Sequence, residues 1–278
     1  MKSESKAGRC ATLVLAADRH AGDVVASATG VACKALAPVG GIPMVQRVIR
    51  SLRASRLVGR ITLVGPARDL LRGDAELERD LGDGTLGWLE NAGSPSASAA
   101  RALQALPPGQ PVLLTTADHA LLSPAIVDHF LEQTLEGDCD FVVGVARLDT
   151  VQTRYPDTRR SAIRLRGGPY CGCNLFAFAS PRSRELAAFW RRIEQERKRP
   201  WRVIAGALGP LATLRYLIGR LTLEQALARL SRKLDMKIGA VVLPFAEAAI
   251  DVDSRADLAL VERVLAQRTA DTERSVQP

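Results

Sequence analysis

Short apolar runs alternate with segments of helical periodicity through the first half of the chain. Continuous apolar runs bounded by polar residues predict buried strands, and such runs cover residues 11–17, 61–65, 111–118 and 140–146. Apolar residues at helical spacing predict helices over residues 43–55, 94–106 and 123–137. Ser94 and Ser123 each precede a proline, which is typical of a helix start. This alternation predicts an α/β fold with a mostly parallel, Rossmann-like sheet and helices on both faces.

The pattern changes after residue 148. Further strands are predicted over residues 174–179, 237–244 and 248–253, and further helices over residues 180–198, 222–233 and 254–268. The apolar stretch 201–218 predicts a buried helix, but its Trp201, Tyr216 and flanking arginines leave peripheral membrane contact as an alternative.

The chain shows no convincing linker, so we expect one domain over residues 1–268. Residues 150–235 are interpreted as a largely helical insertion that covers or extends the functional site. The polar residues 269–278 are expected to form a disordered tail.

Composition limits the class of protein. About half of the 278 residues are apolar (47%), which is enough for a substantial core. No uncharged apolar run is long enough to span a membrane, and the short apolar stretch behind the amino terminus argues against a signal peptide. Five cysteines without framework spacing favour a reducing, cytoplasmic location.

The net charge of +8 indicates an anionic partner. Aromatic residues make up only 4% of the chain and no nucleic-acid-binding motif is present, so we expect a small phosphorylated substrate rather than nucleic acid. An arginine-rich solvated surface would produce the same charge without any partner.

Charged residues follow several of the predicted strands. Asp18 and Arg19 follow the first strand and lead into a loop that ends at Lys34, while Asp118 and Asp253 follow two later strands. In open α/β sheets ligands bind beyond the carboxyl ends of the strands, so these side chains should converge on one edge. Carboxylates there can hold Mg²⁺, and neighbouring cations can bind phosphates.

The loop after the first strand suits a phosphate group. A loop of small residues that leaves a strand tip allows backbone N–H groups to approach phosphate oxygens, and Leu15, Ala16, Ala17 and Asp18 are the candidates for nucleotide binding. Arg19 and Lys34 are then expected to clamp a triphosphate. A solvated surface pair is the alternative interpretation of these two cations, and a turn or helix-capping role is the alternative for Asp118.

Basic residues also gather in the second half of the chain. Residues 154–166 contain five arginines, including Arg159 and Arg160, and residues 191–201 add a second basic group. Both segments can bind a phosphorylated acceptor, although a solvated basic face is equally compatible with them. Asn174 follows a glycine-rich strand entry and is expected to face the same acceptor.

Two other motifs carry weaker signals. The segment 138–140 (DCD) matches a metal-binding DxD, but it precedes its strand and therefore belongs to the opposite edge of the sheet. Cys171 and Cys173 are too few for a metal site and are interpreted as small buried residues. His119 is expected to be a turn residue or to touch a phosphate.

Four segments, taken together and in order, resemble one family. They are "LAADR" with "K-ALAPVGGIPMVQRVI" (15–19 and 34–49), "GSPSASAARAL" (93–103), "VLLTTADHALLSPAIVDHF" (112–130) and "AAIDVDSRADLALVERVL" (248–265). Each is similar to a segment of the nucleotidyltransferases with the GT-A fold, and the set resembles the MobA-like NTP transferases, named for molybdenum cofactor guanylyltransferase. The resemblance covers residues 11–147 and 248–266.

The resemblance implies a GT-A-like fold and transfer of a nucleotide from an NTP to a phosphorylated acceptor with release of pyrophosphate. It places Asp118 at the position of the metal aspartate. The matching serine-rich segment makes Ser94, Ser96 and Ser98 candidates for the nucleobase side, where hydroxyls can read a base edge. Mg²⁺ is the implied cofactor.

Two other functions remain open at this stage. A GT-A glycosyltransferase would use the same fold with a nucleotide sugar. A non-catalytic nucleotide-binding protein is favoured by Ala17-Asp18, which stand where the family has two glycines.

Overall fold

The computed structural model describes residues 10–18, 22–187 and 209–276. The predicted strands of the first half are β1 (Cys10–Leu15), β4 (Val58–Val64), β6 (Val112–Thr116) and β7 (Phe141–Arg147). The predicted helices of that half are α2 (Met44–Arg53), α4 (Pro95–Ala105) and α5 (Pro124–Glu136). Ser94 and Ser123 cap the last two, because each side chain accepts a hydrogen bond from a backbone N–H of the first turn.

Shorter elements fill the connections. They are α1 (Val24–Thr29), β2 (Pro38–Val39), β3 (Ile42–Pro43), α3 (Ala75–Gly82), β5 (Leu86–Leu89), α6 (Leu148–Arg154) and β8 (Ala162–Leu165). Four 3₁₀ helices accompany them in the described chain: η1 (Lys34–Leu36), η2 (Arg68–Leu71), η3 (Pro181–Glu185) and η4 (Ala246–Ala249). The remaining elements are β9 (Gly168–Phe178), α9 (Pro210–Leu217), α10 (Leu223–Leu234), β10 (Ile238–Leu243) and α11 (Arg255–Val276).

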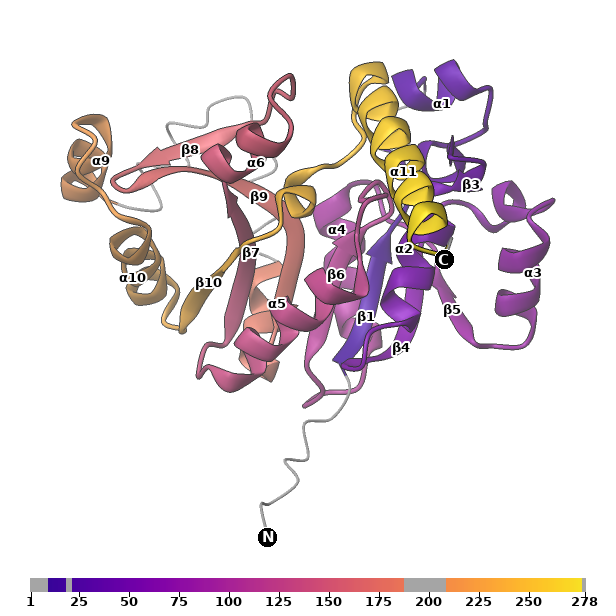
Figure 1. Ribbon diagram of the computed structural model, residues 1–278. Coiled ribbons are helices and arrows are strands. Elements are labelled where there is room, and N and C mark those ends of the chain that lie inside the picture. The colour runs from indigo at the N-terminus through magenta and orange to yellow at the C-terminus, as the bar shows by residue number, and fades with distance from the viewer. Residues whose placement is uncertain (1–9, 19–21, 188–208, 277–278) are drawn as a thin grey trace, which may run out of the picture.

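One sheet joins strands from both halves of the chain (Figure 1). Its order is β10-β7-β9-β6-β1-β4-β5, and β8 pairs with β9 at the side of this path. Strand β9 is antiparallel to β6, β7 and β8, whereas the pairs β1–β4, β1–β6, β4–β5 and β7–β10 are parallel. Seven of the eight strands therefore run in one direction, and the predicted mostly parallel α/β fold is confirmed.

The core lies on both faces of this sheet. One cluster packs α2 and α5 against the sheet through residues such as Val48, Ile49 and Phe130. The other packs α4 against the opposite face through Ala99, Ala102 and Leu103. Helices on both faces bury the continuous apolar strands, which explains why those strands lack polar alternation.

Three sequence predictions need correction. Strand β9 lies between β6 and β7, so this part of residues 150–235 is a central strand and not an insertion. Residues 248–253 form the end of η4 and an extended loop instead of a strand. Helix α11 continues to Val276, so residues 269–276 extend this helix rather than forming a disordered tail.

Helix α9 also differs from the prediction for residues 201–218. Its Leu214, Leu217 and the following Ile218 are exposed, so this part of the stretch is not a fully buried helix. The rest of that prediction, residues 201–208, and the predicted helix beyond residue 187 lie outside the described residues. Among the described residues, no helix is long and apolar enough to cross a membrane.

Candidate active site

The site lies at the carboxyl ends of two neighbouring parallel strands. Leu15, the last residue of β1, is the register partner of Thr116, the last residue of β6. The chain stays paired for one more residue, because the Ala117 N–H donates to the Leu15 carbonyl at 2.9 Å. The loops that carry Asp18 and Asp118 therefore leave the sheet side by side.

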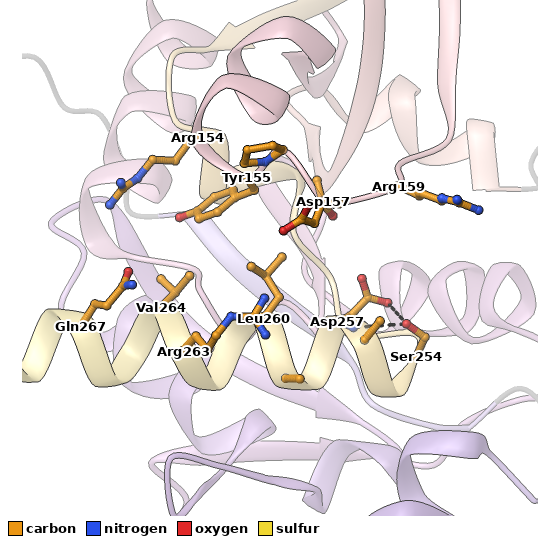
Figure 2. A pocket seen from close by; sticks show the side chains of 14 residues that line it. Arg154, Tyr155, Asp157, Arg159, Ser254, Asp257, Leu260, Arg263, Val264 and Gln267 are labelled. Atoms are coloured by element: carbon orange, nitrogen blue, oxygen red, sulfur yellow. Dashed lines mark hydrogen bonds between the residues drawn. The ribbon is translucent and has the colours of Figure 1, made fainter.

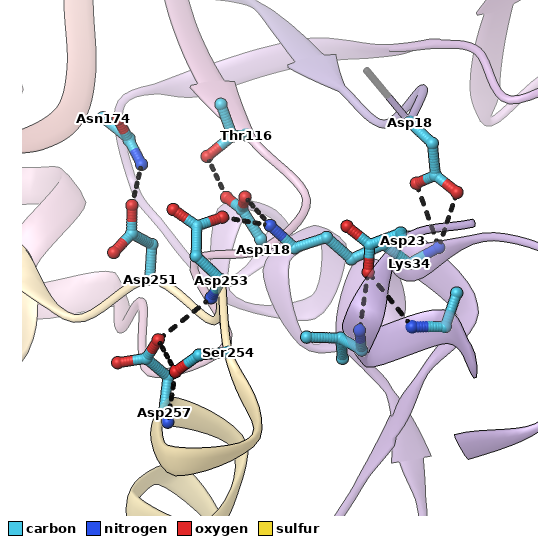
Figure 3. Close-up of polar contacts among 12 residues, drawn as sticks. Asp18, Asp23, Lys34, Thr116, Asp118, Asn174, Asp251, Asp253, Ser254 and Asp257 are labelled. Carbon is cyan, nitrogen blue, oxygen red and sulfur yellow. Dashed lines mark hydrogen bonds and ion pairs between the residues drawn. The ribbon is translucent and has the colours of Figure 1, made fainter. Parts of the chain in front are cut away.

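Lys34 joins the two predicted metal carboxylates (Figure 3). Its Nζ lies 2.7 Å from Asp118 Oδ2 and forms a second ion pair with Asp253. Thr116 Oγ1 donates to the other oxygen of Asp118 at 2.5 Å. The side chains of Lys34 and Asp118 are only 13% and 18% exposed, so the pair is largely shielded from water. Residues 34, 118 and 253, which are far apart in sequence, meet at one point.

The charges in this cluster stabilise one another. Burial alone would raise the pKa of Asp118, but the Lys34 ammonium and the Thr116 hydroxyl hold it below its ordinary value. Burial alone would lower the pKa of Lys34, but Asp118 and Asp253 raise it above its ordinary value. An ammonium facing two carboxylates is therefore the favoured charge state.

Asp18 binds the backbone next to this cluster. Its two carboxylate oxygens accept the Lys34 N–H at 3.0 and 3.1 Å, and burial raises its pKa. Asp23 caps α1 by accepting the N–H groups of Val25 and Ala26. The hydrogen bonds of Asp18 tie the start of the loop after β1 to its end at Lys34. Asp18 thus holds the residue whose side chain reaches the carboxylates. Arg19 and His20 lie outside the described residues.

A pocket of about 360 Å³ opens above the cluster. Among its lining residues are Leu15, Ala16, Ala17, Asp18, Lys34, Asp118 and Asp253. All four predicted phosphate-loop residues therefore face the same pocket as Lys34 and the carboxylates.

A second pocket of about 170 Å³ adjoins the first, and both are lined by Asp118. Ser94 and Ser98 line it, whereas Ser96 is buried and does not. Ser98 Oγ accepts the Ala92 N–H at 2.8 Å, which fixes the turn before α4. This hydroxyl supports the pocket wall through the backbone.

Asn91 is a pocket residue that the sequence prediction missed. It lines the 170 Å³ pocket, and its neighbour across the sheet edge is Gly65. A Cβ on Gly65 would lie 2.8 Å from Ala17 Cβ and 3.1 Å from Asn91 Cβ, and Gly65 has a φ of +66°. A glycine is therefore required where the phosphate loop and the Asn91 turn approach each other.

Comparison with known proteins identifies the family. Residues 12–207 match the model of the MobA-like NTP transferase domain. The chain belongs to this family. It is therefore a nucleotidyltransferase, and the family assignment disfavours the glycosyltransferase alternative. No curated protein sequence matches the chain.

Solved structures with similar folds include other transferases. A hypothetical transferase from Thermus thermophilus is 30% identical with a TM-score of 0.74, over 90% of this chain and 100% of its own. The 4-diphosphocytidyl-2C-methyl-D-erythritol synthase from Anaerococcus prevotii is 13% identical with a TM-score of 0.54, over 94% and 97%. A CMP:2-keto-3-deoxy-manno-octonic acid synthetase complexed with CTP is 12% identical with a TM-score of 0.55, over 93% and 99%. The last two show likeness of fold alone.

The acidic cluster of this family member extends beyond the predicted residues. Arg160 pairs with Asp251 and, at 2.6 Å, with Asp257 Oδ1, and its side chain is only 8% exposed. Asp257 Oδ2 in turn accepts the Asp253 N–H at 3.3 Å and the Ser254 hydroxyl at 2.6 Å. Asp257 was missed, although Ser254 and Asp257 have capping-box spacing before α11. Arg160 is thus connected to Asp253 through Asp257.

Asn174 lies on the other side of Asp251. Its Nδ2 donates to Asp251 Oδ2 at 3.1 Å, and its backbone has a φ of +49°. The register of β7 against β9 shifts between Val143 and Val145, opposite this residue. Such an irregularity re-aims a side chain, and here Asn174 points toward the acidic cluster.

Arg159 and Arg160 face different surroundings. Arg160 is enclosed by its two carboxylates, whereas Arg159 is exposed and lines a groove of about 610 Å³ between residues 154–159 and α11 (Figure 2). The groove begins at Ser254, next to Asp253, and also contains Arg154 and Arg263. We predicted that Arg160 binds the acceptor directly. Its geometry does not favour this role, because both terminal nitrogens of the guanidinium already bind carboxylates.

The weaker motifs lie away from the site. Asp138 pairs with Lys237 at 2.5 Å at the amino end of β7. Cys171 and Cys173 are buried in β9, and burial raises the pKa of both thiols. His119 is buried, with Nε2 3.4 Å from the Glu247 carbonyl and a pKa lowered to about 4 by burial. His119 lies in the turn after β6, where its carbonyl accepts the Leu122 N–H at 2.9 Å, as the turn interpretation predicts, and its burial does not favour contact with a phosphate.

The carboxylate pair fits a magnesium ion. In the described part of the chain no three His, Cys, Asp or Glu residues group as a metal site. Mg²⁺ does not need three, because it is commonly bound by one or two carboxylates together with substrate phosphates and water. Asp118 and Asp253 both direct an oxygen at the point that the Lys34 ammonium reaches, which shows that this point favours positive charge.

Proposed function

We propose that this nucleotidyltransferase transfers an NMP group from a magnesium-bound NTP to a phosphorylated acceptor. An acceptor phosphate oxygen forms a bond to the α-phosphorus, and the bond from that phosphorus to the β-phosphate oxygen breaks to release pyrophosphate. The observation that supports this proposal best is the meeting of Lys34, Asp118 and Asp253 beneath a pocket that the phosphate loop also lines.

Asp118 and Asp253 would hold Mg²⁺, whose charge would offset that of the phosphates. Lys34 would turn from the carboxylates to the phosphates and stabilise the negative charge that develops on departing pyrophosphate. Residues 15–18 would direct backbone N–H groups at the phosphates, and Arg19 would supply the second cation. The protein's part in this chemistry is positioning and electrostatic stabilisation.

The smaller pocket would hold the nucleobase. Ser94 lines it directly, whereas Ser98 supports its wall through Ala92 and Ser96 supports Ser94, whose hydroxyl lies 3.2 Å from the Ser96 hydroxyl. The turn at Asn91 contributes further polar groups to the same pocket. We infer that the base is read here by backbone groups and short polar side chains.

The acceptor would approach from the side of Asn174 and Arg159. Asn174 borders the acidic cluster, and the groove that Arg159 lines begins beside Asp253. Exposed guanidinium groups suit phosphate oxygens. We assign Arg160 to support of the cluster rather than to acceptor binding. The five free cysteines support the expected cytoplasmic location.

Pyrophosphate release tests the proposal. The full chain is incubated with each of four NTPs, with and without Mg²⁺, and with a panel of sugar phosphates and other phosphate monoesters, while thermal shift measures NTP binding. We expect one NTP to raise the melting temperature and to release pyrophosphate only with Mg²⁺ and an acceptor. Binding without release for every acceptor would favour a non-catalytic role, and turnover of a nucleotide sugar would favour a glycosyltransferase.

A further inference from the structure

Helix α9 presents apolar side chains to solvent. Leu214, Leu217 and Ile218 are 55%, 73% and 54% exposed. Their spacing of three and four residues places them on one face of the helix. Scattered exposed apolar residues are ordinary, but two leucines and the isoleucine that caps the helix, gathered on one face, are characteristic of an interaction surface.

Exposed arginines surround this apolar face. Arg215 lies on α9 beside this face and Arg220 follows the helix, and neither forms an ion pair with another residue that the structure describes. The Arg166 N–H donates to the Leu221 carbonyl at 2.8 Å, which joins the end of β8 to the chain after α9. Strand β8 thereby brings the exposed Ile163 and Arg164 to the same part of the molecule. We call Leu214, Arg215, Leu217, Ile218 and Arg220 the α9 surface.

The α9 surface lies at the periphery of the molecule. In Figure 1, α9 is at the outer edge beyond β8 and β10, at the opposite end from α3 and α11. A planar partner can therefore approach it without meeting the rest of the sheet.

We propose that the α9 surface attaches this protein to an anionic membrane surface. Apolar side chains flanked by arginines match the interface of a bilayer, where leucines enter the acyl boundary and guanidinium groups bind lipid phosphates. A second copy of the chain is a poorer partner, since a two-fold contact would bring Arg215 and Arg220 of both copies together. This inference does not depend on the proposed reaction.

Vesicle sedimentation of the full-length chain tests the proposal. The vesicles contain either phosphatidylcholine alone or phosphatidylcholine with phosphatidylglycerol. We expect at least about tenfold stronger binding to the anionic vesicles, and a several-fold loss when the salt is raised well above about 0.1 M, because screening weakens exposed charges. Absence of binding to anionic vesicles, or equal binding to both kinds, would overturn the proposal.

Variants assign the binding to the surface. Leu214→Ser with Leu217→Ser and Ile218→Ser should weaken binding by at least about tenfold, and Arg215→Gln with Arg220→Gln should remove the preference for anionic lipid. The matched control is Leu70→Ser with Val242→Ser, which alters exposed apolar residues elsewhere and should leave binding unchanged. Thermal melts with NTP establish that each variant is folded.

A single substitution gives an independent measurement. Leu217→Trp should show a blue-shifted difference fluorescence on anionic vesicles, because its side chain would move from water to the lipid interface. An unshifted spectrum would contradict the proposal even if the triple variant failed to fold. A triple serine variant that binds vesicles like the parent, but changes from dimer to monomer in light scattering, would assign the α9 surface to self-association instead.

Discussion

The ammonium of Lys34 lies 2.7 Å from a carboxylate oxygen of Asp118, at the place where a divalent cation would meet the same oxygen. A lysine in this position keeps two neighbouring carboxylates compatible before any metal or nucleotide has bound. Under the proposed function it would give way when they bind. Lys34 would then have two separable effects, one on catalysis and one on metal affinity.

Lys34→Ala should lower kcat about 10²- to 10³-fold, the usual cost of removing one preorganised electrostatic group. Without the ammonium, the carboxylates attract cations more strongly, so Mn²⁺ should bind the NTP-free variant more tightly than the parent. Turnover assays and electron paramagnetic resonance titration with Mn²⁺ measure the two effects. Weaker Mn²⁺ binding in the variant would show that Lys34 does not compete with the metal.

Asp118→Asn should abolish turnover and the Mg²⁺-dependent thermal shift by NTP, because one metal oxygen and one partner of Lys34 are lost together. The matched control is Asp138→Asn, which removes an exposed carboxylate at the opposite edge of the sheet and should leave both unchanged. Circular dichroism reports whether the fold is intact. Full activity of Asp118→Asn with Mg²⁺ would refute the assignment of the metal to this carboxylate.

Variants of Arg160 and Arg159 should distinguish support of the acidic cluster from binding of the acceptor. Arg160→Gln leaves two shielded carboxylates without their cation and should destabilise the fold by about 3–5 kcal/mol, with partial recovery in Arg160→Lys. It should also weaken Mn²⁺ binding, since Arg160 is connected to Asp253 through Asp257.

Arg159→Gln is the matched control for that variant, because Arg159 is exposed. It should leave stability within about 0.5 kcal/mol of the parent and raise the KM of the acceptor but not of the NTP. Steady-state kinetics and urea unfolding distinguish the two arginines. Equal loss of stability in both variants would contradict the different surroundings described above.

Glu247 should make stability depend on pH. Burial opposes its charge, but the backbone, the Tyr155 hydroxyl at 3.0 Å and Arg268 at 3.2 Å hold its pKa below the ordinary value. The folded state therefore stabilises the ionised form of Glu247 more than the unfolded state does. Its contribution is complete above the unfolded pKa of about 4.3 and disappears as the pH falls through the folded pKa.

Glu247→Gln should consequently cost about 1–2 kcal/mol at neutral pH and progressively less as the pH drops below about 4. Urea unfolding of parent and variant over this range measures the difference. A difference that stays constant with pH would mean that Glu247 acts through packing rather than charge.

Local signals were sufficient for much of the fold. A few consecutive residues are enough to identify each apolar run of β1, β4, β6 and β7 and each serine cap of α4 and α5. The structure of residues 248–253 was harder to predict. Their apolar composition is typical of a strand, but whether a neighbouring strand is present to pair with them cannot be read from composition. Its Val252 N–H instead donates to the Asp118 carbonyl at 3.1 Å.

Strand β9 shows the same limit. Its entry "GPYCGC" has weak strand propensity, and its central place depends on pairing with both β6 and β7. The site was predicted in part because strand ends are readable. The contact of Lys34 with residues 84 and 219 positions away depends on side-chain direction and is not encoded in any local pattern. Asn91 was missed because its role depends on the space left by Gly65.

The single reversed strand, β9, separates two groups of parallel strands in the sheet. Strands β1, β4, β5 and β6 pair in parallel with one another on one side of β9, and β7 and β10 pair in parallel on its other side, while β8 pairs with the first residues of β9 opposite β7. Because all these strands except β9 run in the same direction, their carboxyl ends lie at the same edge of the sheet as the pocket above Lys34, which under the proposed function would hold the phosphates. Within the chain between β7 and β10, Arg160 pairs with Asp257 beside the site and Arg184 donates to the Leu103 carbonyl of α4. Residues 209–237 are therefore the part of this segment best suited to change in length and composition. Such a layout is modular: under the proposed function, exchanging residues 209–237 between family members offers a direct route to chains with altered acceptor preference and the same nucleotide.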